Sequence, residues 1–168
     1  MKKSLITILF LSVLLSFNSC GIYSFTGASI APGIKTISIQ YFTNQASLVQ
    51  PTLSQTLTDA LKDRFMQQTN LKIVNGRGDL NIEGAITNYS TQPVAIQSND
   101  QAALNRLSIT IRVTFTNEQD EKQNFETTFT RYEDYDSRLS LSSVEDNLIK
   151  VISEALVEDI FNKSVANW

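Results

Sequence analysis

The sequence predicts an α+β fold, a two-layer sandwich in which a four-stranded mixed β-sheet carries two α-helices on one face, in the order β-α-β-β-β-α. Polar and apolar residues alternate in several short segments, which is typical of strands with one buried face. In two longer segments apolar residues recur at spacings of three and four, which is typical of helices with one buried stripe. Elements that each have a single apolar face cover one another best in two layers.

The N-terminal half predicts one strand followed by one helix. Residues 34–42 alternate, with Ile37, Ile39 and Tyr41 on one face that should meet the core, and the polar residues 43–45 are typical of a turn. The helix is expected from Val49 to Gln68, with Pro51 in its first turn, where the missing N–H costs no hydrogen bond. A strand–helix–strand order predicts a right-handed parallel crossover.

Three further strands are expected. Residues 71–90 form one strand, broken by an Asn-Gly-Arg-Gly turn at 75–78. Residues 92–103 are a long polar loop or a flaring hairpin. The clearest alternation in the chain, at 107–115, predicts a strand that is buried on one face only, and a further strand is expected at 125–132.

A second helix is expected to close the domain. The Ser-Ser-Val-Glu sequence has the form of a capping box, with Ser142 as N-cap and Glu145 reaching back, and the helix runs to about Asn162. One shared core should join the central strand to both helices. The residues predicted for this core are Ile109, Ile111, Val113, Leu57, Leu61, Leu148, Ile152 and Leu156.

The first residues have the layout of a secretory signal. Lys2 and Lys3 precede an apolar run at 4–16, and the small Ser19 stands directly before Cys20. We therefore expect a signal peptide at 1–19 that is removed, a lead at 20–33 and one domain at 34–168. The apolar run is shorter than the ~20 residues of a membrane span.

Cys20 is the single cysteine of the chain. Its setting resembles the lipobox of bacterial lipoproteins, in which this thiol receives a diacylglycerol, although Phe17 and Asn18 depart from the strict pattern. The alternative is an ordinary secreted protein whose thiol lies in the discarded peptide. In the lead, Tyr23 and Phe25 are too apolar for a pure tether, and we expect them to pack on the domain or on a partner.

Charge and composition exclude several functional classes. The chain has 14 basic and 17 acidic residues, so loss of Lys2 and Lys3 with the signal leaves 12 against 17, a net charge of −5. Nucleic acid needs a basic footprint and is therefore not an expected partner. The chain has no histidine, which removes the commonest general base and transition-metal ligand. We expect no enzyme activity and no cofactor.

Three features admit a chemical and a structural interpretation. The acidic residues from Glu118 to Asp136 are of the type that glycosidases and calcium sites use. Because no calcium-loop pattern is present, they indicate a solvated surface. The turn at 75–78 lacks the Gly-Lys-Ser/Thr ending of a phosphate loop. Trp168 is suited equally to anchoring at a membrane interface and to capping the core.

A lipobox, an aromatic lead, a strand, a helix, three strands and a terminal helix, in this order, resemble the LptE family of lipopolysaccharide-assembly lipoproteins. The segments that carry the resemblance are Cys20–Phe25, the strand 37–39 with the helix at 49–65, and the strand 106–113. The resemblance implies an outer-membrane lipoprotein on the periplasmic side that plugs the LptD β-barrel, assists its assembly and binds lipopolysaccharide. The alternative is a scaffold lipoprotein of another cell-envelope complex.

The family resemblance also suggests where ligand and partner would bind. It implies that lipopolysaccharide is bound by basic residues in the turn between the second and third strands and just before the last helix. Here the turn at 97–101 and the segment 139–141 have none, and the nearest cations are Arg106 and Arg138. Both are equally interpretable as solvated or ion-paired surface groups. The polar sheet face, with Arg112, is the expected contact with the barrel wall.

Overall fold

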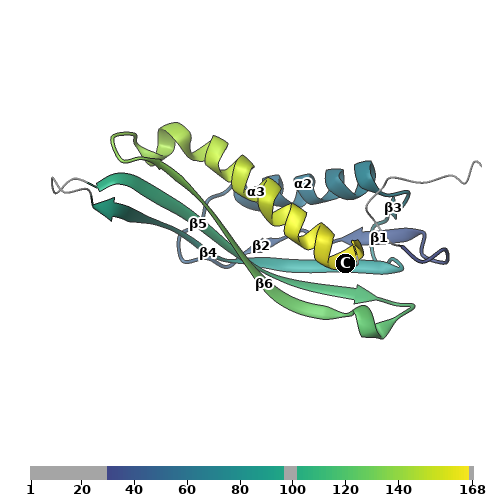
Figure 1. The fold of residues 1–168 in the computed structure, drawn as a ribbon. Coiled ribbons are helices and arrows are strands. Elements are labelled where there is room, and N and C mark those ends of the chain that lie inside the picture. The colour runs from purple at the N-terminus through teal and green to yellow at the C-terminus, as the bar shows by residue number, and fades with distance from the viewer. Residues whose placement is uncertain (1–29, 97–101, 167–168) are drawn as a thin grey trace, which may run out of the picture.

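The computed structural model describes residues 30–96 and 102–166, and it confirms the α+β class. Both described helices lie on one face of a mixed sheet, and the other face is bare (Figure 1). The elements are β1 Thr36–Ile39, β2 Thr43–Asn44, α2 Leu53–Gln68, β3 Lys72–Ile73, β4 Leu80–Ile96, β5 Ala102–Asn117, the 3₁₀ turn η2 Glu121–Gln123, β6 Phe125–Asp136 and α3 Leu141–Val165.

In the described part of the chain the sheet has six strands rather than four, in the order β3-β1-β4-β5-β6, with β2 also on β4. The predicted turn at 43–45 is wrong, because Thr43 and Asn44 pair in parallel with Ala85 and Ile86. The expected strand at 71–90 is two strands. Its break carries the chain across β1, so that β3 and β4 flank β1, both parallel to it.

The hairpin of β4 and β5 is much longer than the alternation indicated. The segment 92–103 is mostly strand, because β4 continues to Ile96 and β5 begins at Ala102. The flaring-hairpin alternative is therefore correct. In Figure 1 this hairpin extends past α2 at the left of the molecule.

A β-bulge at Thr87 changes which residues of β4 face the helices. Ile86 pairs with Ile111, but the next pair is Asn88 with Thr110, so Thr87 is an extra residue. Before the bulge the even-numbered residues point to the core, and after it the odd-numbered ones do. Tyr89 is thereby turned inward and buried.

Both helices begin at different residues from those expected. Helix α2 starts at Leu53, not Val49, because the side chain of Gln50 accepts a hydrogen bond from the Thr52 N–H at 2.6 Å and makes a turn that contains Pro51. Helix α3 has Ser140, not Ser142, as N-cap.

The capping box is also absent, because Glu145 does not reach back to the helix start. Its carboxylate instead accepts a hydrogen bond from the Tyr89 hydroxyl at 2.5 Å. This contact ties the start of α3 to β4 at the point where the bulge has turned Tyr89 inward. Burial is the main reason that the pKa of Tyr89 lies above its usual value, and the hydrogen bond to Glu145 adds to the effect.

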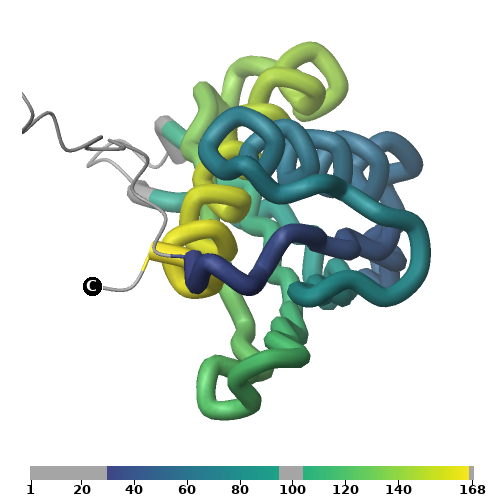
Figure 2. The backbone as a smooth tube through the Cα atoms, turned by 90° about the vertical axis from the view of Figure 1, so that its right-hand side faces the viewer, coloured from purple at the N-terminus to yellow at the C-terminus, as the bar shows by residue number. Residues whose placement is uncertain are grey.

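The predicted core is confirmed. All eight residues named from the sequence are buried in one cluster that joins the sheet to both helices. The two helices also contact each other through Phe65 and Phe161, whose ring centroids are 5.1 Å apart in an edge-on arrangement. The described chain begins and ends at the same end of the molecule (Figure 2).

Asp79 fixes β1 at its start. One carboxylate oxygen of Asp79 accepts hydrogen bonds from the backbone N–H of Lys35 at 2.8 Å and of Thr36 at 2.9 Å, and from the Thr36 hydroxyl at 2.8 Å. The bond from the Lys35 N–H is the largest of the effects that hold the pKa of Asp79 below its usual value.

Strand β6 is the free edge of the sheet over residues 125–136. Two charged residues of β6 stand at positions that face the helices, because Arg131 pairs with the buried Ile109 and Glu133 with the buried Leu107. Arg131 is held by Asp159 of α3 through two hydrogen bonds, of 2.6 and 2.5 Å. Charges on the inward side are one of the devices that protect edge strands from pairing with other chains.

The ring of Phe42 takes the place of a side chain on β4. Gly84 belongs to the core-facing row of β4, and Phe42 lies over it, fully buried. A Cβ atom at Gly84 would stand 2.7 Å from the Cζ atom of this ring and nearer still to Cε1. A glycine in a strand often marks such a close approach.

We predict that Gly84→Ala destabilises the protein by about 1–3 kcal/mol, as overpacking of a tight core does. Alanine is otherwise the better strand residue, so a neutral or positive change in the melting temperature, measured by circular dichroism, would contradict this packing. As a control, Phe42→Leu in the Gly84→Ala chain should restore part of the lost stability, because it removes the ring atoms that the methyl group meets.

Candidate functional site

The bare face of the sheet is the candidate functional surface, and we call it the polar sheet face. Its side chains project from β4, β5 and β6 away from the helices, and cross-strand pairing sets them in rows. The Thr110 and Thr130 hydroxyl oxygens, for example, are 3.0 Å apart. The rows are Gln92–Arg106–Asp134, Ser90–Ser108–Tyr132, Asn88–Thr110–Thr130, Ala85–Arg112–Thr128 and Glu83–Thr114–Glu126.

Arg106 is held on this face by two neighbours from β6. Its Nε and Nη2 atoms donate to the two carboxylate oxygens of Asp134 at 2.7 and 2.9 Å. Its guanidinium carbon also lies 3.6 Å from the centroid of the Tyr132 ring, a cation–π contact. The ion-paired alternative for Arg106 is thus what the structure shows, and any anionic ligand would compete with Asp134.

This pairing stabilises the charged form of the Asp134 carboxylate. The Arg106 guanidinium holds the pKa of Asp134 below its usual value, chiefly through the hydrogen bond. Both side chains are about one-third exposed, so solvent screens the pair and it contributes little to folding stability. That contribution is present above the unfolded-state pKa of Asp134 and is lost as the pH falls through the lower folded-state pKa.

Arg138 is paired with a neighbour in its own turn. Its Nε donates to an Asp136 carboxylate oxygen at 2.9 Å, and its backbone N–H donates to the same residue at 2.9 Å. Hydrogen bonds from the Arg138 side chain, followed by that from its backbone, bring the pKa of Asp136 down to about 2. Asp136 and Asp134 project from the same face of β6, so both arginines belong to the hairpin end of the molecule.

Arg112 is much less engaged than the other two arginines. It lies on the polar sheet face in the row of Ala85 and Thr128. Its Nε is 3.9 Å from the nearest Glu126 oxygen, too far for a hydrogen bond, and about half of its side-chain surface is exposed. Six residues along β5 separate it from Arg106, about 20 Å.

A shallow hollow of about 290 Å³ lies beside Arg112, where β1 leads into β2. The small side chain of Ala85 leaves room between larger neighbours, and the exposed Tyr41 is part of the lining. Gln40 crosses to β4 and donates to a Glu83 carboxylate oxygen at 2.8 Å. The remaining lining residues are Thr43, Gln45 and Thr114.

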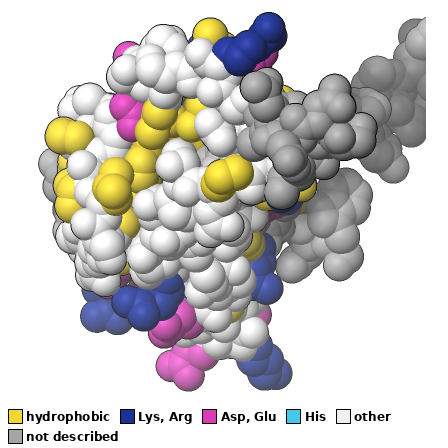
Figure 3. Space-filling view, turned by 90° about the vertical axis from the view of Figure 1, so that its left-hand side faces the viewer, with side chains coloured by type: hydrophobic (Ala, Val, Ile, Leu, Met, Phe, Trp, Pro, Cys, Tyr) yellow, Lys and Arg dark blue, Asp and Glu magenta, His cyan; other side chains and the backbone are white. Residues whose placement is uncertain are grey.

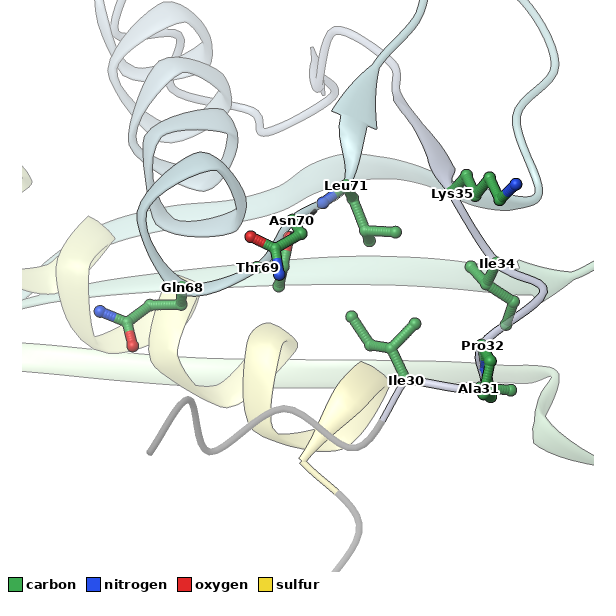
Figure 4. Close-up of a pocket in the computed structure, with 9 residues that line it drawn as sticks. All are labelled: Ile30, Ala31, Pro32, Ile34, Lys35, Gln68, Thr69, Asn70 and Leu71. Atoms are coloured by element: carbon green, nitrogen blue, oxygen red, sulfur yellow. Dashed lines mark hydrogen bonds between the residues drawn. The ribbon is translucent and has the colours of Figure 1, made fainter. Parts of the chain in front are cut away.

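A second groove, of about 330 Å³, lies where the chain enters the domain (Figure 4). The side chains of Ile30, Ile34 and Leu71 point toward one another, while Lys35 and Gln68 point away. Ile30 packs against the main core here. The groove thus seats the end of the lead against the turn after α2, and it contains no group suited to catalysis.

The hairpin end of the molecule exposes apolar side chains. In Figure 3 they form separate patches among polar atoms, with charged groups toward the top and the bottom of this view. The exposed large hydrophobic residues of the loops and strand ends include Leu48, Val49, Leu104 and Leu139. A mixture of apolar and polar surface is what non-obligate partner contacts use.

Several sequence-based expectations lie outside the described residues. Cys20, Tyr23 and Phe25 precede residue 30, the turn at 97–101 is not described, and Trp168 follows residue 166. Within the described ranges no cluster of acidic, cysteine or histidine side chains is arranged to hold a metal ion. No helix in those ranges combines the length and the hydropathy that a membrane span requires.

The fold is a small α+β domain with helices on one side and an open polar sheet on the other. Residues 34–164 match the LptE model, described as lipopolysaccharide-assembly. The chain therefore belongs to the LptE family of lipopolysaccharide-assembly proteins. No curated protein matches the sequence.

Solved structures show the same fold at low sequence identity. A minor lipoprotein from Acinetobacter baumannii is 15% identical, with a TM-score of 0.51 over 78% of this chain and 92% of its own. Lipoprotein B from Nitrosomonas europaea is 15% identical, with a TM-score of 0.54 over 84% and 86%. The rare lipoprotein B from Shewanella oneidensis is 17% identical, with a TM-score of 0.50 over 75% and 90%.

Sequence reasoning missed the partners of its own candidate residues. Asp134 was expected only as part of an acidic, solvated surface and Tyr132 only as the end of a strand, yet together they clamp Arg106. Strands β5 and β6 pair in one continuous register, in which the two residue numbers of each pair add up to 240. Correct placement of the turn at 117–124 would therefore have predicted that Arg106 stands opposite Asp134. Tyr41, predicted to face the core with Ile37 and Ile39, is exposed because the strand breaks at Gln40.

We predict that Arg106→Ala raises the pKa of Asp134 toward its ordinary value, because the carboxylate loses its two charge-assisted hydrogen bonds. The titration of the Asp134 carboxyl carbon, followed by NMR, measures this directly. Arg112→Ala is the matched control and should leave Asp134 unchanged. An Asp134 pKa that does not move in Arg106→Ala would show that the pair does not form in solution.

Proposed function

We propose that this protein is a non-enzymatic outer-membrane lipoprotein, lipidated at Cys20 and facing the periplasm, that binds inside the LptD β-barrel and assists the insertion of lipopolysaccharide. The polar sheet face is the observation that carries the proposal beyond family membership. The lumen of an outer-membrane barrel is polar. A plug needs a broad face of hydrogen-bonding side chains, and the sheet offers hydroxyl and amide groups along three strands.

The charge of this face suits a protein partner better than a polyanion. Asp134 and Asp136 are each matched by an arginine, and Glu83 and Glu126 add two further carboxylates, so the face has no excess of positive charge for a polyanion. The apolar residues at the hairpin end, such as Leu104 and Leu139, add contact area beside the polar rows. In this proposal Tyr23 and Phe25 contribute to the partner contact from the lead, and Arg112 contacts the barrel wall.

Co-purification tests the barrel partner. A tagged full-length protein, extracted in detergent from cells that make it naturally, should retain LptD. Thr128→Lys with Thr130→Lys should reduce the recovered barrel at least tenfold, because both exposed positions lie on the polar sheet face. The matched control is Gln55→Lys with Gln67→Lys on the exposed side of α2, which should recover the barrel as the unaltered chain does.

Recovery of a different envelope complex in place of a barrel would contradict the proposed function and favour the scaffold alternative. Recovery of the barrel with both pairs of lysines would leave the partner correct and the polar sheet face wrong as its contact. Retention of the melting temperature by all three chains separates a lost contact from a lost fold.

A lipopolysaccharide contact at Arg106 predicts opposite effects for the two members of the ion pair. Arg106→Gln should lower lipopolysaccharide retention at low salt, because it removes the cation. Asp134→Asn should raise it, because the guanidinium is freed for a phosphate. Both effects should fade as salt screens the charges. Equal retention by both variants and the unaltered protein would exclude Arg106, and the same pair of tests applies to Arg138 and Asp136.

A further inference from the structure

The hollow beside Arg112 brings two unengaged side chains together. Tyr41 is 58% exposed, and its hydroxyl makes no hydrogen bond within the described residues. The Arg112 guanidinium likewise donates no hydrogen bond there, and its nearest carboxylate oxygen is 3.9 Å away. These two groups thus differ from Arg106 and Arg138, whose donors are already taken by carboxylates.

The acceptors of the hollow are also partly free and are held in place. Gln40 donates to one oxygen of Glu83 and leaves the other oxygen of that carboxylate open within the described chain. Gln45 donates to the Thr43 hydroxyl across 3.4 Å, a long hydrogen bond that a ligand can replace. Donors and acceptors therefore line the hollow together, beside the small side chain of Ala85.

This lining selects the class of ligand by its chemistry. The carboxylate of Glu83 repels phosphates and other anions, and Arg112 repels cations. Amides, hydroxyls and charged groups line most of the hollow, so an acyl chain would leave them without partners. A ligand with many hydroxyl groups satisfies donors and acceptors together, and the C–H face of a sugar ring packs on an exposed aromatic ring.

We propose that the hollow between Tyr41 and Arg112 is a saccharide-binding subsite, which takes uncharged sugar residues of the lipopolysaccharide oligosaccharide. The assignment to lipopolysaccharide rests on the proposed function, while the sugar chemistry rests on the hollow itself. A volume of about 290 Å³ suits a sugar ring with its substituents rather than a long glycan. Tyr41 stacks on the ring, and Arg112 and Glu83 hydrogen-bond its hydroxyls, so that at Arg112 the sugar takes the place of the proposed contact with the barrel wall.

The test uses the mature full-length protein in detergent and the lipid-free oligosaccharide released from lipopolysaccharide by mild acid. Saturation-transfer NMR should show contact with the sugar, and titration should show that Tyr41→Ala weakens binding at least tenfold. Tyr41→Phe should bind almost as the unaltered protein does, because stacking needs only the ring. Met66→Ala is the control, since it removes another half-exposed large side chain, on α2 and away from the polar sheet face, and should not change binding.

The outcomes separate this subsite from the proposed function. No saturation transfer to the unaltered protein, or equal binding by Tyr41→Ala, would overturn the subsite even if the barrel co-purifies. Equal or tighter binding of a disaccharide from peptidoglycan would overturn its assignment to lipopolysaccharide. Loss of barrel recovery in Tyr41→Ala without any sugar binding would instead make the hollow a barrel contact. Failure of the unaltered chain to recover LptD counts against the proposed function alone.

Discussion

The pairing of β4 with β5 is the constraint on which the rest of the molecule depends. Side chains alternate between the two faces of a strand, so one register decides which residues meet the helices and which remain in water. The bulge at Thr87 is part of that decision. It turns Tyr89 toward α3, where Glu145 accepts a hydrogen bond from its hydroxyl, and so fixes the start of the last helix. The same pleat places the threonines, serines and arginines of β5 on the open face.

This register also explains why the open face, in the described part of this acidic protein, has few free arginines. Arg106 stands opposite Asp134 on β6. Two residues further along, Asp136 accepts a hydrogen bond from Arg138. The charges of the open face are thus paired within the chain before any partner arrives. Arg112 is the exception, because the residue opposite it is a threonine and its nearest carboxylate, Glu126, is one row away. Because most arginines of the face are already paired, the face favours a polar partner. Arg112 keeps hydrogen-bonding capacity that a ligand can use.

The sequence was sufficient to predict the elements that have a repeated pattern of apolar residues. The alternation in 107–115 and the helical spacing of Leu148, Ile152 and Leu156 identified the core, because burial acts on many residues in the same way. Features that depend on one contact or on the position of one turn were not predictable from this pattern. The break after β1 depends on the fit of Phe42 over Gly84, and the partners of Arg106 depend on the position of one turn. Likewise, the two-residue strand β2 has no apolar alternation of its own to reveal it.

The free edge of β6 has a consequence for the protein before it meets any partner. A strand of 12 residues with open backbone groups is a template on which a second chain can grow. Arg131, bound to Asp159 on α3, and the neighbouring Glu133 put charges where an added sheet would need apolar side chains. The proposed lipid anchor would concentrate the protein on a membrane surface, where molecules meet often. Two inward charges on β6 thus let many copies share that surface as separate molecules rather than as a fibril.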